Sequence, residues 1–207
     1  HAQVDWRASW IAHPNVGPEE AGVFHFRKDL QIEEVPEDFV VHVSGDNRFR
    51  LYVNGAQVSS GPALNDPMHW RYQTLDLAPY LRAGNNVVAA TVWDWGDARP
   101  GAQMSLRTGF LLQGEGEAAA SLDTSEDWQV LWNQAWEFAP VNMVELGTYY
   151  VAAPGEHING ALYPWGWQGE ASALEGWVNA IPVGATSTAS PVAAARGSDG
   201  YGVAGSW

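Results

Sequence analysis

A β-strand that ends in a tight turn is encoded by Ser44-Gly45-Asp46-Asn47-Arg48-Phe49-Arg50-Leu51-Tyr52-Val53-Asn54-Gly55. Phe49, Leu51 and Val53 fall on one face of an extended chain, which is the period-two pattern of a half-buried strand. The dipeptide Asn54-Gly55 is the strongest short hairpin signal, because both of its residues tolerate positive φ. The stretch therefore predicts a strand followed by a hairpin turn.

The rest of the chain carries the same kind of signal. Short apolar or alternating runs are separated by clusters of Gly, Pro, Asn and Asp, a pattern typical of antiparallel sandwiches. The single helical indication is one turn at 78–81. We therefore predict an all-β protein, an antiparallel β-sandwich of the jelly-roll, galactose-binding-like type. Strands are expected at 23–30, 39–43, 70–77, 86–93, 105–112 and 128–132, with further strand or edge elements at 165–167 and 176–180.

The chain of 207 residues is expected to form one sandwich domain over 1–184. A Gly- and Ala-rich segment near 114–127 is either a long loop or a linker. The segments after it are assigned to the same sandwich, because a separate domain with so much Gly and Pro would have a thin core. Residues 185–207 hold few large apolar side chains and are predicted to form an extended or mobile C-terminal tail.

Composition and net charge exclude several classes of function. The chain has 10 basic and 24 acidic residues, a net charge of −14, which argues against nucleic acid and against anionic membrane surfaces. No apolar run is long enough to span a membrane. With no cysteine there is no disulfide, thiolate metal site or cysteine nucleophile. The acidity fits a neutral ligand, or one bound through a cation held by carboxylates, although solubility alone also accounts for it.

Asp46 and Asn47 are the first candidate site residues. Their carboxylate and amide oxygens are the hard ligands that Ca²⁺ prefers. Adjacent side chains on a strand point to opposite faces, so both can reach one ion only if the backbone bends, which Gly45 permits. The alternative is an Asx-turn that starts the strand.

Tryptophans supply two more candidates. Trp70 follows a turn-rich loop and either stacks on a sugar ring or packs in the core. The run Trp93-Asp94-Trp95 leads into a Gly- and Pro-containing loop, which at the end of a sandwich is a usual ligand position, with core packing as the alternative. No histidine pair has the spacing of a metal site, and the adjacent acidic pairs are read as solvated charge rather than as a glycosidase pair.

Several of these motifs, in one order, resemble the jelly-roll domain that precedes the catalytic barrel in bacterial α-L-rhamnosidases. The match runs from Ala8-Ser9-Trp10-Ile11 to about Leu112 and includes the hairpin above, Gly61-Pro62-Ala63 and the segment 81–90. Rhamnose-binding jelly rolls related to these enzymes use an Asp-Asn pair with a calcium ion that bridges protein and sugar. The resemblance thus implies that Asp46 and Asn47 bind Ca²⁺, with Trp70 beside the sugar.

The catalytic acids of that family lie in a helical barrel, and no helical pattern of that kind occurs here. The resemblance therefore implies a non-catalytic module that binds L-rhamnose or a related sugar. It also implies a rhamnose-containing glycan as partner, a covalently linked catalytic domain in a longer parent, and an extracellular or periplasmic location. Two alternatives stay open. One is a purely structural domain that packs on a catalytic barrel, and the other is a small stand-alone glycosidase or lyase.

Overall fold

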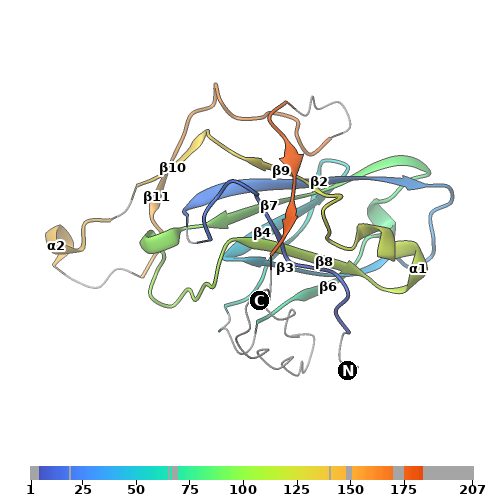
Figure 1. Cartoon of the computed structure of the whole chain (residues 1–207), viewed down its shortest axis with the longest axis horizontal. Coiled ribbons are helices and arrows are strands. Elements are labelled where there is room, and N and C mark those ends of the chain that lie inside the picture. The colour runs from blue at the N-terminus through green and yellow to red at the C-terminus, as the bar shows by residue number, and fades with distance from the viewer. Residues whose placement is uncertain are drawn as a thin grey trace.

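Two antiparallel β-sheets face each other in the computed structural model of the chain (Figure 1). The structure describes residues 5–18, 20–64, 66, 70–139, 141–147, 151–169 and 175–183. The predicted all-β sandwich is confirmed. The predicted tail at 185–207 lies outside the described residues. In the part of the chain that is described, no helix has the length and apolar content needed to cross a bilayer.

The first sheet has six strands and is built around one long antiparallel pair. Eleven residues of each central strand, β2 and β7, pair in unbroken register, from Gly22 opposite Asp94 to Ile32 opposite Gly84. In spatial order the strands are β12 (Val178–Asn179), β9 (Gln129–Trp132), β2 (Gly22–Ile32), β7 (Gly84–Asp94), β4 (Arg48–Val53) and β5 (Ala56–Gly61).

The second sheet has five strands. Its central pair, β3 and β8, runs from Val41 opposite Gly114 to Asp46 opposite Gly109, so Asp46 lies at the end of the ladder. The last described strands, β12 and β13, add one edge to each sheet, as expected for segments that close a sandwich. The spatial order is β13 (Ile181–Pro182), β1 (Ile11–Ala12), β8 (Gly109–Gly114), β3 (Val40–Asp46) and β6 (Gln73–Asp76).

The core lies between the two sheets and follows the period-two pattern. Alternate residues of each strand point inward, and each large apolar side chain buried there contributes roughly 1.5–3 kcal/mol. The intervening residues of β2 and β7 therefore face outward on the six-stranded sheet. Fully buried inward side chains include Phe24, Phe26, Val41, Val43, Phe49, Leu51, Val88, Val92, Phe110 and Leu112.

Local predictions compare well with the structure, with three differences. Asn54 and Gly55 both have positive φ in the turn between β4 and β5, and a 3₁₀ turn forms at Ala78–Tyr80, as predicted. The segment 165–167 is a turn and not a strand, since Gly166 adopts a φ of 77°. The region near 114–127 holds two short helical turns, α1 (Gly116–Ala119) and η3 (Ala120–Leu122), and a hairpin after β9 was not anticipated.

That hairpin begins a third layer outside the six-stranded sheet. It pairs β10 (Trp136–Ala139) with β11 (Gly155–Ile158), and the helical turn α2 (Met143–Leu146) lies at its outer end (Figure 1). Further along the chain, Trp167 is fully buried and its ring stacks on His25 at a centroid distance of 3.9 Å. The guanidinium of Arg27 donates to the carbonyls of Trp167 and Gly169 and so anchors the layer to β2.

His25 makes the fold sensitive to acid. Its ring is completely buried between Thr91 and Asn133, at 3.2 and 2.8 Å, and burial lowers its pKa to about 3. A folded-state pKa below the unfolded value of about 6.5 means that the unfolded chain binds the proton more tightly. The contribution of neutral His25 to the stability of the fold is therefore fully present above pH 6.5 and is lost as the pH falls toward 3.

We expect His25 to lower the free energy of unfolding by about 1.4 kcal/mol for each pH unit below about 6. Urea denaturation of the protein and of His25→Gln between pH 7 and pH 4 measures this. The difference between the two curves isolates His25 from the acidic groups. If the free energies of unfolding of the two proteins fall in parallel with pH, the lowered pKa of His25 is contradicted.

Candidate functional site

The Asp46-Asn47 pair joins β3 to β4 and is completely buried. Asp46 Oδ1 accepts a hydrogen bond of 2.8 Å from Asn47 Nδ2, so the two side chains do meet, as a shared role requires. Asp46 Oδ2 accepts from the backbone N–H groups of Leu106 and Arg107 at 2.8 and 3.2 Å. The carboxylate therefore fastens a loop that lies sixty residues away in the sequence.

Asn47 and Asp94 complete this buried network. Asn47 binds the β7 end twice, because its N–H donates to the Trp93 carbonyl at 3.0 Å and its Oδ1 accepts from Trp95 N–H at 3.1 Å. Asp94 accepts from Gly96 N–H at 2.7 Å and from the Thr108 hydroxyl at 3.1 Å. Together these contacts hold both ends of the 95–108 loop against the sandwich.

Burial raises the pKa of both carboxyl groups of the network. Desolvation raises the pKa of Asp46 to about 6, and the nearby charge of Asp94 adds to the rise, while the hydrogen bonds from Asn47, Leu106 and Arg107 oppose it. The pKa of Asp94 is raised by desolvation as well. These shifts show how costly the two charges are inside the protein, and the donated hydrogen bonds compensate for that cost.

As arranged, this network does not fit a calcium ion shared with a sugar. Ca²⁺ takes six to eight oxygen ligands, whereas the described residues contain no group of three or more His, Asp or Glu side chains that could hold a metal. The Asp46 oxygens already accept hydrogen bonds, and neither Asp46 nor Asn47 reaches the surface. Calcium binding by the pair stays a prediction for experiment.

Trp70 lies inside the protein. Its side chain is 1% exposed, its ring packs edge-on against Trp10 at 6.1 Å, and its indole N–H donates to Ser44 Oγ at 3.2 Å. It belongs to a small core on the outer face of the five-stranded sheet with Trp10, Ala12, Leu111 and Val183. Stacking on a sugar needs an open ring face, which Trp70 does not offer in this arrangement.

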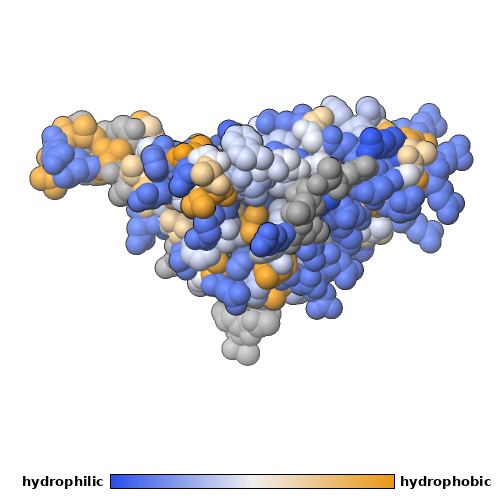
Figure 2. Space-filling view, turned by 90° about the horizontal axis from the view of Figure 1, so that it is seen from above, coloured by the Kyte–Doolittle hydropathy of each residue, from blue (hydrophilic) through white to orange (hydrophobic). Residues whose placement is uncertain are grey.

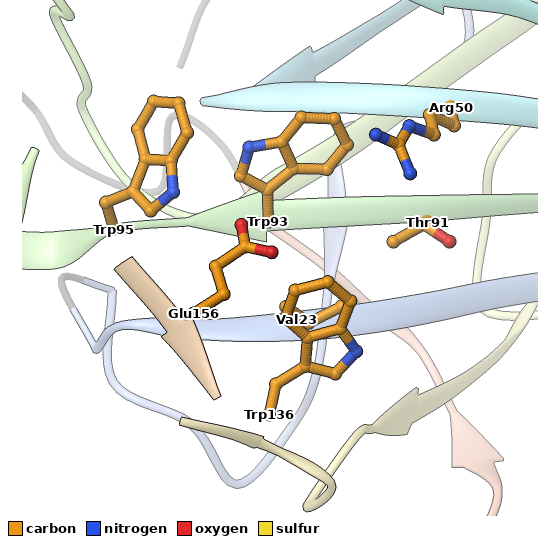
Figure 3. Close-up of a pocket in the computed structure, with 7 residues that line it drawn as sticks. All are labelled: Val23, Arg50, Thr91, Trp93, Trp95, Trp136 and Glu156. Carbon is orange, nitrogen blue, oxygen red and sulfur yellow. The ribbon is translucent and has the colours of Figure 1, made fainter. Parts of the chain in front are cut away.

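The run Trp93-Asp94-Trp95 leads instead to a pocket. The pocket lies on the outer face of the six-stranded sheet, under the β10–β11 hairpin, and has a volume of about 120 Å³. Figure 3 shows its lining residues: Val23 of β2, Arg50 of β4, Thr91 and Trp93 of β7, Trp95 just beyond β7, Trp136 of β10 and Glu156 of β11.

Aromatic walls and unpaired donors define the pocket. The rings of Trp93 and Trp136 bound it on opposite sides, with the Glu156 carboxylate between them (Figure 3). The indole nitrogens of Trp95 and Trp136 are buried, and within the described structure neither has a hydrogen-bond partner. A buried N–H without an acceptor costs free energy, so a ligand oxygen that reached either donor would offset that cost.

Two opposite charges lie in the same pocket. The Arg50 guanidinium sits over the Trp93 ring, with its central carbon 5.4 Å from the ring centre, a cation–π arrangement. Desolvation raises the pKa of Glu156, and the charge of Arg50 opposes that rise. Arg50 can donate hydrogen bonds to one ligand oxygen, and Glu156 can accept a hydrogen bond from another hydroxyl. Because the two charges are opposite, the pocket has no net charge of its own.

The fold explains how these side chains are brought together. Arg50 and Thr91 are cross-strand partners in the β4–β7 pair, and Trp93 pairs with Val23 across β7 and β2. Trp95 is held by Asn47, so the buried pair positions one wall of the pocket without lining it. The Trp93–Trp95 run was a candidate from the sequence alone, whereas Arg50, Trp136 and Glu156 were not recognised there as site residues. Only the alternation within Trp136-Glu137-Phe138-Ala139 hinted at a strand there.

No protein-family model matches the chain, and no curated protein matches its sequence. Among solved structures, the chain is similar to the GH78-family rhamnosidase of Bacillus sp. GL1, with 24% identity and a TM-score of 0.74 over 90% of this chain and 19% of that one. The α-L-rhamnosidase of Aspergillus terreus has 15% identity and a TM-score of 0.63 over 86% of this chain and 21% of that one.

A lectin from Pleurotus ostreatus, solved in complex with GalNAc, shares the fold more distantly. It has 20% identity and a TM-score of 0.53, over 88% of this chain and 43% of the lectin. The resemblance to a rhamnosidase domain is thus confirmed as a likeness of fold. The chain spans about a fifth of the length of the two rhamnosidases, so it corresponds to one domain's worth of those enzymes.

The buried pair can be tested through stability. We expect Asp46→Ala to lower the free energy of unfolding by about 2 to 4 kcal/mol, because it leaves the N–H groups of Leu106 and Arg107 unpaired. Urea denaturation with and without a calcium chelator measures this. If the pair has a purely structural role, the chelator should leave the free energy of unfolding unchanged. If the pair holds calcium, the chelator destabilises the protein, and Asp46→Ala removes that sensitivity.

Trp70 can be tested in the same way. Truncation of a fully buried tryptophan costs about 3–5 kcal/mol, so we expect Trp70→Ala to destabilise the fold by that amount. Trp70→Phe keeps most of the volume and should lose much less. A Trp70→Ala variant that unfolds like the parent but binds sugar more weakly would restore the sugar-stacking prediction.

Proposed function

We propose that this chain is a non-catalytic carbohydrate-binding module, accessory to a polysaccharide-degrading α-L-rhamnosidase, and that the pocket beside Trp93 holds the sugar. The observation that carries the proposal is the pocket itself, in which tryptophan rings stand beside Arg50 and Glu156, and in which two lining residues, Trp95 and Trp136, keep buried indole N–H groups without a partner in the described structure. Sugars present apolar C–H faces to aromatic rings and hydroxyl oxygens to donors, so one such ligand satisfies both features.

The chemistry of the remaining lining residues is compatible with L-rhamnose or a related sugar. Rhamnose is a deoxy sugar that carries a methyl group, and Val23 offers an apolar contact beside the indole rings. Its hydroxyls can donate to Glu156 and accept from Arg50, so neither charge is left without a partner when the mouth is filled. The likeness of fold to rhamnosidase domains and to a lectin supports the same class of ligand.

A binding role is favoured over hydrolysis by the carboxylates of the pocket. Glycoside hydrolysis requires two carboxyl groups about 5 to 9.5 Å apart across the scissile bond. Glu156 is the one carboxylate that lines the pocket in the described structure. Asp46 and Asp94 lie in the buried network, where their oxygens accept hydrogen bonds from the protein.

Two other placements of function compete with this one. The first is the calcium-assisted site at Asp46 and Asn47, which the resemblance implied. The second is a purely structural domain that packs on a catalytic barrel. The exposed apolar side chains near α2 favour packing, among them Val144 at 90% exposure, and they colour the projecting left end of the molecule orange in Figure 2. A covalently linked enzyme and a location outside the cytoplasm belong to the proposal as well.

Calorimetric titration with L-rhamnose, galactose and glucose, each with and without a calcium chelator, separates these possibilities. Binding in the pocket should survive the chelator, whereas binding at Asp46 and Asn47 should disappear. Absence of heat for every sugar would favour the structural domain.

Within the pocket, Trp136 gives the sharpest test. Trp136→Phe keeps an aromatic ring but removes the N–H donor, and the loss of one hydrogen bond should weaken rhamnose binding about three- to tenfold. Trp136→Ala also removes the wall and should weaken binding further. Val144→Ala, at an exposed site outside the pocket, is the matched control and should bind normally. Wild-type affinity in Trp136→Ala, with unchanged thermal unfolding, would place the sugar elsewhere.

A further inference from the structure

Two arginines of β4 lie next to each other on the outer face of the six-stranded sheet. Phe49, between them, points into the core, so Arg48 and Arg50 share the outer face, about 6.5 Å apart along the strand. Arg48 is the cross-strand partner of Trp93, and Arg50 lines the pocket with its guanidinium over the Trp93 ring. Both side chains therefore start beside the same wall of the pocket.

Neither arginine has an ion-pair partner in the part of the chain that the structure describes. Three other basic residues, Arg7, Arg27 and Lys28, each lie within 4.0 Å of an aspartate oxygen, whereas no carboxylate of the described residues lies that close to Arg48 or Arg50. The Nε atom of Arg48 is in addition buried without a hydrogen-bond partner. In a chain with 24 acidic and 10 basic residues, two adjacent cations without such a partner call for an explanation.

The strands on either side of β4 explain why the partners are missing. The residues opposite the two arginines on β7 are Trp93 and Thr91, and β5 (Ala56–Gly61) contains no charged residue. The one carboxylate that lines the pocket is that of Glu156, whose pKa the charge of Arg50 lowers against the effect of desolvation. Counting the lining residues together with Arg48, one negative charge therefore faces two positive charges.

We infer that Arg48 and Arg50 form an anion-binding subsite at the edge of the pocket, so that the glycan bound here carries a carboxylate or sulfate group beside the sugar in the pocket. This inference rests on the proposed function of the pocket. A guanidinium can donate two parallel hydrogen bonds to the oxygens of such a group, and these bonds are stronger than those to a neutral hydroxyl. An anion at this place also supplies the opposite charge that the described chain does not provide.

The net charge of −14 restricts the kind of anionic ligand rather than excluding it. At physiological ionic strength, charges in solvent are largely screened from one another beyond about 8 Å, so an anionic group at β4 is governed mainly by the two arginines. A densely charged polyanion would extend over the rest of this acidic protein and be repelled by it. We therefore expect a glycan in which single acidic groups are separated by neutral sugars.

Two matched pairs of ligands test the subsite by calorimetric titration of the full chain. The first pair is galacturonic acid linked to L-rhamnose and galactose linked to L-rhamnose in the same way, which differ by one carboxylate. The second pair is L-rhamnose sulfate and L-rhamnose. At least one charged ligand should bind about five- to tenfold more tightly than its neutral counterpart. Raising the salt from about 0.05 M to about 0.5 M should remove most of that ratio, because the arginines are partly in solvent.

Variants of β4 locate the preference. Arg48→Gln removes a guanidinium that does not line the pocket, and the ratio of charged to neutral affinity should fall about three- to fivefold. Arg48→Lys keeps the charge but not the paired donors, and should retain part of the ratio. Arg82→Gln is the matched control, because Arg82 is an exposed arginine near the opposite end of β7 from Trp93 and its loss changes the net charge equally. Thermal unfolding of each variant checks that the fold is intact.

The outcomes separate the two levels of inference. If the neutral sugars bind and neither charged ligand binds more tightly, the anion subsite is wrong while the proposed function stands. The same holds if Arg48→Gln keeps the full ratio, or if Arg82→Gln lowers the ratio as much, since the overall charge then accounts for it. If only the charged ligands bind, the subsite stands and binding of rhamnose by itself is overturned. If no ligand binds the parent protein, both the subsite and the proposed function are overturned.

Discussion

The buried Asp46 carboxylate is the constraint on which the pocket end of this molecule depends. Its two oxygens accept three hydrogen bonds, two of them from the backbone of the loop that follows β7. A charge buried in this way is expensive, and its elevated pKa of about 6 reflects that expense. The same burial makes the hydrogen bonds strong, because no water competes for them. The loop is thereby tied to the strand ends rather than left to fluctuate.

The consequence reaches the pocket through Asn47. Asn47 accepts from Trp95 N–H and donates to the Trp93 carbonyl, so the two tryptophans at the pocket are oriented by the same buried network. In this structure the Asp46-Asn47 pair therefore helps to position side chains that line the pocket. The arrangement follows a general pattern in which binding side chains sit on loops that a rigid scaffold holds.

The outer layer supplies the other half of the pocket. Arg27 and His25 are polar residues of β2 that face away from the sandwich core, and both are buried because the chain after β9 folds back over them. Their hydrogen bonds and ring contacts compensate for that burial. By covering the sheet in this way, the layer turns a flat strand surface into a recess with Trp136 and Glu156 on one side.

Much of the sandwich could be predicted from local sequence, because strand alternation and turn chemistry are short-range effects. The Asn54-Gly55 turn and the alternation of β2 and β7 are examples. The pattern of a strand shows which residues share a face, but not what covers that face. Trp70 and Trp93 both stand near strand ends beside loops, yet one is buried against Trp10 and the other borders a pocket. That difference depends on contacts between distant segments.

The candidate site likewise combines features that the local sequence predicted with features that only the fold decided. Residue type and order in Trp93-Asp94-Trp95 singled out a run whose two tryptophans do line a pocket. The roles of Asp46 and Asn47 were not readable, since their partners at 106–107 and 93–95 lie about fifty to sixty residues along the chain. Trp136 and Glu156 enter the pocket only because a hairpin packs on β2. Strand periodicity and turn chemistry are set by residues that are neighbours in the sequence. Burial and the pairing of polar groups are properties of the folded chain as a whole.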